Sequence, residues 1–286
     1  MGEAKTAPPG KPVFFTDLAK PAKDLLQKGF TLGHTICFSC LGPSGVTIST
    51  NATMVDGSMI GIITSSFKRE GIKTDLSVTT LNQITASATY ENLAPGLKAS
   101  LTTTMPGAAN VGKAQVQYQN DLAAVTATIQ GLKSKPSFDC SATLGSESLH
   151  VGGSFMYDTE KNGLTGSTAG FGFLTKDASA ALVIDPMSGK CIDAYCSQTI
   201  NQRASWGCHL NHKWEKKLST FTFGGSFKLD PFTTVKARMD NHGIVQTLLQ
   251  HEPTPFISVG MLAQVDTTAL QSTTPKVGFS LTVLAV

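Results

Sequence analysis

Cysteine and histidine pairs offer the most obvious chemistry in this sequence. Cys37 and Cys40 form a CxxC pair, and Cys208 is followed by His209 and His212. These residue types bind zinc or carry out redox reactions. Both groups fall in segments that read as β-strands, where residues three apart face opposite sides. We therefore predict no metal site, and we expect all six cysteines to be reduced and mostly structural.

Other catalytic patterns are also missing from the sequence. It contains no nucleophile elbow, phosphate-binding loop, HExxH motif or spaced carboxylate pair. The net charge of +3 and the pI near 8.5 are too mild to indicate a nucleic-acid partner. We therefore expect no catalytic residue, no cofactor and no bound nucleic acid.

A cluster of charged residues near the N-terminus is more informative. It consists of Asp17, Lys20, Lys23, Asp24 and Lys28. Between these charges, apolar residues recur at helical spacing, namely Leu18, Ala22, Leu25 and Leu26. One face of a helix would carry the apolar side chains and the other face the charges. The sequence therefore predicts one short amphipathic helix.

The ends of this helix can be predicted from its capping residues. Thr16 or Asp17 is suited to begin it, and Gly29 is suited to end it. Pro21 should kink the helix or confine its regular part to the residues that follow. The prolines and glycine of residues 7–12 indicate a disordered leader before it.

From residue 31 to residue 286 the hydrophobic period changes from 3.6 to 2. Ile84, Ala86 and Ala88, for example, alternate with Thr85 and Ser87. Turn signals recur often enough to leave strands of about 9 to 11 residues, the length that a tilted strand needs to cross a bilayer. Dividing this region by about 13 to 14 residues per strand and turn gives roughly 18 to 20 strands. The alternation weakens only in residues 185–217, where we expect strands near a rim with longer loops.

A membrane β-barrel explains this pattern better than a soluble fold does. Charged residues make up only 15% of the chain, against about 25% in typical soluble proteins. The polar strand faces carry Thr, Ser, Gln and Gly instead. A soluble β-sandwich or propeller would have shorter strands, and a propeller would repeat a signature motif. No run of 18 apolar residues and no apolar secretory signal core occurs, so neither a transmembrane helix nor export is supported.

Three motifs, in the same order along the chain, resemble the eukaryotic mitochondrial porins, the voltage-dependent anion channels. The first is the helix sequence of residues 15–28, and the second is the PGLK segment of residues 95–98. The third and most specific is LDPFTTVKARMDN in residues 229–241, continued by QHE in residues 250–252. The resemblance covers nearly the whole chain after the leader and looks strongest to the plant members.

This resemblance implies a barrel of about 19 strands with the amphipathic helix in the lumen. Residues 1–30 would form the leader and pore helix, and residues 31–286 the transmembrane barrel. An odd number of strands requires the first and last strands to pair in parallel, and these would lie near residues 31–41 and 276–286. The resemblance, and not the spacing, gives the count of 19.

The resemblance also implies a function. We expect a voltage-gated, weakly anion-selective channel of the mitochondrial outer membrane that passes ions, phosphate and nucleotides. The gating and selectivity residues would be those of the helix, Asp17, Lys20, Lys23, Asp24 and Lys28. Lys98, Lys236 and Arg238 fall on polar strand faces and are candidate lumen charges.

The expected partners are membrane lipids and small anions. Association into a homo-oligomer is a further possibility that the sequence does not decide. Two alternatives from other classes also stay open. One is a protein-import pore of the same barrel fold, which should carry acidic peptide-binding tracks. The other is a soluble β-rich binding module.

Overall fold

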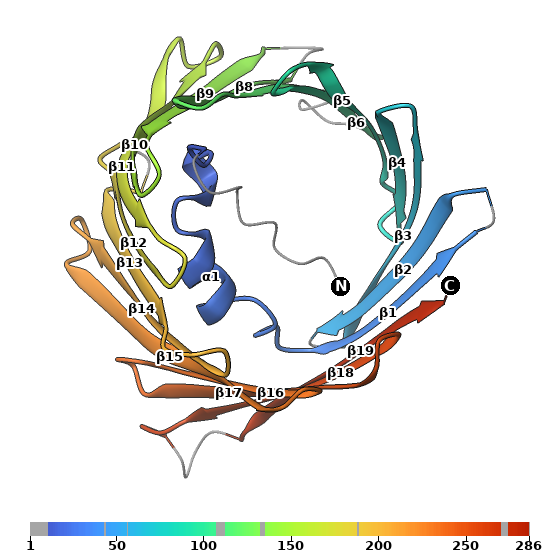
Figure 1. Ribbon diagram of the computed structural model, residues 1–286, viewed down its shortest axis with the longest axis vertical. Coiled ribbons are helices and arrows are strands. Elements are labelled where there is room, and N and C mark those ends of the chain that lie inside the picture. Colours follow the sequence, from blue (N-terminus) through green and yellow to red (C-terminus); the bar gives the residue numbers. More distant parts are fainter. Residues whose placement is uncertain are drawn as a thin grey trace.

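The computed structural model describes residues 11–42, 44–55, 57–106, 112–131, 135–187, 189–269 and 274–285. The expected leader therefore lies mostly outside the described residues. The described chain forms a single closed 19-stranded sheet around a lumen, with one short helical segment inside it (Figure 1). No helix among the described residues combines the length and hydrophobicity that a membrane span requires.

The strands follow one another around the barrel, each antiparallel to the next. They are β1 (His34–Leu41), β2 (Val46–Val55), β3 (Ser58–Arg69), β4 (Ile72–Thr79), β5 (Ile84–Ala94), β6 (Leu97–Met105), β7 (Lys113–Gln119), β8 (Ala123–Gln130), β9 (Ser137–Gly145), β10 (Leu149–Asp158), β11 (Gly163–Leu174), β12 (Ala178–Asp185), β13 (Cys191–Thr199), β14 (Ala204–Lys213), β15 (Leu218–Asp230), β16 (Thr233–Asp240), β17 (Ile244–Thr254), β18 (Ile257–Asp266) and β19 (Lys276–Ala285).

The barrel closes through a parallel pairing between β1 and β19. The register runs from His34 opposite Phe279 to Cys40 opposite Ala285. On its other edge β1 pairs antiparallel with β2. Closure leaves no free sheet edge, so the backbone polar groups of every strand can be paired within the wall, as a hydrocarbon environment requires. The expected fold and the expected parallel seam are both confirmed.

The wall has a lumen face and an outward face that alternate along each strand. Contacts with the inner helical segment identify Gly172 on β11 and Gly224 on β15 as lumen-facing positions. Their neighbours Phe171 and Phe223 therefore face outward, and each is 47% exposed. Exposed apolar side chains on the outward face are what a lipid-facing wall requires.

The inner segment has two parts, a 3₁₀ turn η1 (Phe15–Asp17) and the helix α1 (Lys20–Leu26). Pro21 lies in the first turn of α1, where its missing N–H leaves no helical hydrogen bond unmade. The helix was expected to be regular only after Pro21, but α1 begins at Lys20, one residue before it. The predicted caps are wrong, because Thr16 and Asp17 both lie within η1, Ala19 precedes α1 without a side-chain hydrogen bond, and Gln27 rather than Gly29 follows its last residue.

Residues 185–217 are more regular than the sequence indicates. They contain all of β13 and β14, paired in one unbroken register from Cys191 opposite Lys213 to Thr199 opposite Ser205. Short turns connect these strands, so the expectation of longer loops is wrong. The alternation is blurred because the lumen face here carries ionisable and aromatic residues that contact one another and the helix, such as Asp193, Tyr195 and His209.

Candidate functional site

The helical segment lies along the inner wall of the barrel rather than across its centre (Figure 1). Its η1 turn contacts β9 and β10, and α1 contacts β12, β13, β14 and β15. The face formed by Leu18, Ala22 and Leu26 is buried against the wall, with each side chain at most 2% exposed. The predicted apolar face is therefore confirmed. The opposite face is left to the lumen.

Glycines in the wall make room for the apolar side chains of this segment. A Cβ atom on Gly172 would lie 2.7 Å from Leu18 Cδ2, and the next nearest atoms would be Leu174 Cδ1 at 3.4 Å and Leu18 Cβ at 3.7 Å. The same close approach, at 2.9 to 3.0 Å from a side chain of the segment, occurs at Gly152 and Gly170 beneath Phe15, at Gly207 beneath Leu25 and at Gly224 beneath Leu26. We call these five residues the glycine seat. It was not predicted, because a glycine within a strand does not reveal what lies over it.

Arg238 on β16 holds the C-terminal end of the helix. Its Nη1 donates a hydrogen bond to the carbonyl oxygen of Leu26 at 2.5 Å, and its Nε donates to Gln246 Oε1 at 2.7 Å. The guanidinium also lies 4.7 Å from the centre of the Phe30 ring. A cation is favoured here because the last carbonyls of a helix are unpaired and carry partial negative charge.

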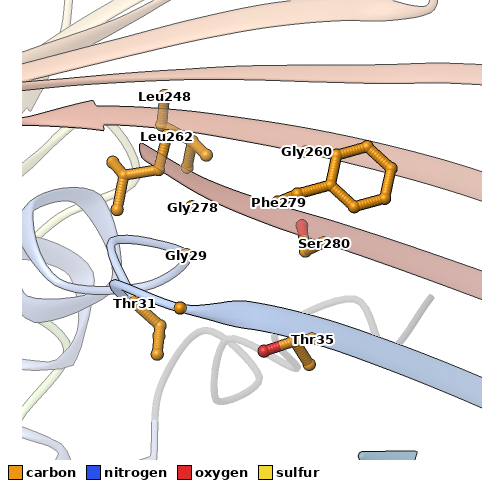
Figure 2. A pocket seen from close by; sticks show the side chains of 10 residues that line it. Gly29, Thr31, Thr35, Leu248, Gly260, Leu262, Gly278, Phe279 and Ser280 are labelled. Atoms are coloured by element: carbon orange, nitrogen blue, oxygen red, sulfur yellow. The ribbon is translucent and has the colours of Figure 1, made fainter. Parts of the chain in front are cut away.

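The linker after the helix is fixed in a recess next to the barrel seam (Figure 2). Phe30 is buried against Leu248 and Leu262. Gly29 and Gly33 flank this contact with φ values of 92° and 122°, a backbone conformation that other residues rarely adopt. Beside them a cavity of about 120 Å³ remains. The linker thus turns from helix to strand at two glycines around one buried aromatic side chain.

The predicted helix charges lie on or beside the lumen face. Lys20 pairs with Asp17 at 3.6 Å across one turn, and Lys23 Nζ lies 5.2 Å from the centre of the Tyr195 ring. Lys28 is exposed just beyond the helix, and its carbonyl oxygen accepts a hydrogen bond from Lys236 Nζ at 3.5 Å. Asp24 is partly exposed and acts on the same Lys236 through its charge.

Beneath Lys23 the wall carries a polar network that sequence reasoning did not predict. Tyr195 stacks on His209 with ring centres 4.2 Å apart. Asp193 Oδ1 then contacts His209 Nε2 at 2.9 Å and accepts a hydrogen bond from Asn211 at 2.8 Å. His209 therefore belongs to the lumen wall, whereas His212 bonds Ser219.

The third predicted lumen charge, Lys98, lies on β6, away from the helix. It is the register partner of Glu91, which pairs with Lys68 at 2.5 Å. Close by, Lys73 pairs with Asp75 at 3.0 Å. The structure therefore gathers three lysines on neighbouring strands and brings Lys236 and Arg238, but not Lys98, to the helix. Lys68 and Lys73 were missed, although their places on the polar faces of their strands could have revealed them.

The N-terminal end of the described chain is tied to the wall near the β7–β8 turn. Gln119 donates a hydrogen bond to the carbonyl oxygen of Pro12 at 2.8 Å, and Lys11 pairs with Asp121 at 3.5 Å. Since Arg238 holds the other end, the segment is attached at both ends and along its apolar face. The arrangement positions cations in an aqueous lumen.

Comparison with known proteins agrees with this architecture. The family model for eukaryotic porins matches residues 11–278, nearly all of the described barrel and helix. The chain belongs to the eukaryotic porin family. It is therefore a pore-forming membrane protein through which small solutes pass, and the soluble-module alternative is excluded.

Curated plant porins are similar over almost their full length. The outer plastidial membrane protein porin of Pisum sativum is 32% identical over 94% of this chain and 97% of the relative. The mitochondrial outer membrane protein porin 4 of Arabidopsis thaliana matches with the same identity and coverage. Its counterpart in Oryza sativa is 33% identical over 96% of this chain and 86% of the relative. The mitochondrial names support the expected location of this porin in the mitochondrial outer membrane.

A solved bacterial porin from Rhodopseudomonas blastica also aligns, with a TM-score of 0.46 and 10% identity over 88% of this chain and 95% of that chain. The assignment of the fold rests on the strand pairing described above.

Proposed function

We propose that this porin is a voltage-gated, weakly anion-selective diffusion channel for ions, phosphate and nucleotides. One observation carries the proposal. A cation-rich helical segment lies on the lumen wall with its apolar face buried and its lysines toward the water. The proposed site consists of Asp17, Lys20, Lys23, Asp24 and Lys28 on the segment, with Lys98, Lys236 and Arg238 on the wall.

The selectivity follows from the charges along the path. Between residues 11 and 28 four lysines face two aspartates, and Lys236 and Arg238 add positive charge beside them. Ion pairs such as Asp17 with Lys20 neutralise part of this excess. In a wide aqueous lumen, partly neutralised rings of positive charge favour anions without strictly excluding cations. A weak preference for anions is the expected consequence.

The lumen lysines also bear on the remaining alternative, a protein-import pore with acidic peptide-binding tracks. Across β3, β4 and β6 the wall presents Lys68, Lys73 and Lys98, while the acidic residues Glu91 and Asp75 already pair with two of these lysines. Such a surface favours small anions over basic peptides. The observation supports the diffusion channel.

The gating follows from the small size of the helix and from its net charge. An α1 of seven residues is too short to be stable alone, so its structure depends on contact with the wall. A net charge of about +2 crossing a potential of 50 mV changes the energy by about 2.3 kcal/mol. Burial of one leucine side chain contributes about the same, roughly 1.5 to 3 kcal/mol. A moderate voltage therefore shifts the balance between the docked and undocked segment by about the contribution of one of its several buried side chains.

We expect the reversal potential to test the selectivity. In a planar bilayer with a KCl gradient, the purified porin should give a reversal potential of the sign for chloride preference. A Lys20→Gln/Lys23→Gln variant should move it toward zero, because two lumen cations are lost. A Lys176→Gln/Lys161→Gln variant makes the same charge change on turns between strands and should leave it unchanged. A cation-selective reversal potential of the intact porin would refute the anion preference.

A further inference from the structure

Two neighbouring turns on one rim of the barrel are joined by a backbone hydrogen bond and an ion pair. The turn between β12 and β13 ends at Lys190, and the turn between β14 and β15 spans residues 214–217. The backbone N–H of Trp214 donates a hydrogen bond to the carbonyl oxygen of Lys190 at 3.0 Å. Lys190 Nζ in return pairs with Glu215. We call Lys190, Trp214, Glu215, Lys216 and Lys217 the basic rim platform.

Tryptophan positions along β14 place this platform at the membrane surface. Trp206 lies on the outward face, opposite Gly225 and 6.1 Å from the Phe223 ring, and Trp214 directly follows the last residue of the same strand. Eight residues span about 26 Å of strand, or about 20 Å along the membrane normal at a tilt of about 40°. This separation approaches the height of the apolar band of a barrel, about 25 Å. The two tryptophans therefore mark its two borders, where aromatic girdles lie.

The lysines beyond Trp214 are available for binding. Lys216 and Lys217 are exposed, and among the described residues no acidic side chain lies within ion-pair distance of either. Glu215 is the acidic residue of the turn, and its hydrogen bond and ion pair with Lys190 lower its pKa. Glu215 therefore stays ionised and engaged with Lys190. The outer part of the platform carries the ammonium groups of Lys216 and Lys217, of which Lys216 also acts on Glu215 through its charge.

We propose that the basic rim platform is a binding site for anionic phospholipid headgroups. Lys216 and Lys217 contact the phosphate oxygens of the headgroup, and the Trp214 ring lies at the border between headgroups and acyl chains. Lysines at a membrane surface are attracted to anionic lipids by about 1 kcal/mol each. The turn of residues 214–217 is bonded to Lys190, so the backbone that carries the two lysines is already placed at this rim. The site is separate from the lumen and does not depend on ion passage.

Fluorescence of Trp214 tests this proposal directly. The chain has two tryptophans, so a Trp206→Phe variant leaves Trp214 as the sole reporter. This variant is reconstituted with a small, equal fraction of brominated phosphatidylglycerol or brominated phosphatidylcholine. We expect the anionic lipid to quench Trp214 more strongly, with an enrichment of about fivefold for each engaged lysine.

Further changes separate the platform from a general effect of charge. Adding Lys216→Gln/Lys217→Gln should remove the difference between the two lipids, and adding Lys161→Gln/Lys176→Gln should preserve it. Inorganic phosphate in the buffer should leave the difference between the two lipids in place, since the proposed ligand is also held at the acyl-chain border beside Trp214. Loss of the difference in phosphate would assign the lysines to free phosphate and overturn the lipid site. Equal quenching by both lipids in the Trp206→Phe variant would overturn the proposal. An equal loss in both lysine double variants would also overturn it, because net charge alone would then explain the preference.

Discussion

A Gly172→Val substitution is expected to loosen the helical segment from the wall and lower the voltage at which the channel closes. The new side chain would occupy the space of Leu18, which is fully buried. Expelling one leucine costs about 2 kcal/mol, or roughly a 30-fold shift toward the undocked state. For a net charge of about +2, this energy corresponds to roughly 40 mV.

Two measurements can follow this change. In planar bilayers the voltage of half-closure should fall, and in detergent trypsin should cleave after Lys23 faster than in the unmodified porin. Gly163→Val is the matched control on the same strand, because the nearest atom to its new Cβ would be a backbone oxygen 3.6 Å away. If the voltage and the cleavage rate of Gly172→Val matched those of this control, the glycine seat would not hold the helix.

Arg238→Gln is expected to have the second large effect, on both helix anchoring and selectivity. The substitution removes the charged donor to the carbonyl oxygen of Leu26 and the contact with Phe30. Hydrogen bonds to charged groups contribute about 1.5 to 3 kcal/mol, so closure should again require less voltage. The anion preference should fall as well, because a lumen cation is lost.

Arg238→Lys separates these two consequences. Lysine keeps the positive charge but cannot reach Leu26 and Gln246 together through the planar fork of arginine. Selectivity in this variant should therefore stay near the original value, while the voltage of closure still falls. Normal closure in both variants would show that the helix end is held by other contacts.

The fold could be predicted from the sequence because the information is local. Alternation as in Ile84–Ala88 identifies both faces of a strand within a few residues, and the apolar spacing of Leu18, Ala22 and Leu26 identifies the buried face of the segment. The exact number of strands and their parallel seam were predicted from the resemblance. The spacing of the strands alone limits their number only to roughly 18 to 20.

The candidate site could be predicted only in part, because it depends on which segments meet across the barrel. The sequence places Lys236 and Arg238 on a polar face, but not against the carbonyl oxygens of residues 26 and 28, more than 200 residues away. Gly172 looks like an ordinary strand glycine until Leu18 is seen above it. The capping prediction failed for a more local reason, since Pro21 displaces the start of α1 beyond Asp17.

The most direct test of the channel and its gate is the current through single porins in a planar bilayer, recorded over a range of voltages. The intact chain should give a large open conductance that steps to a lower level as the voltage rises. Deletion of residues 1–30 should preserve the large conductance and abolish the steps, because the segment whose release from the wall is proposed to close the channel is gone. Absence of a large conductance would contradict the pore, and unchanged closure after the deletion would contradict the role of the helix.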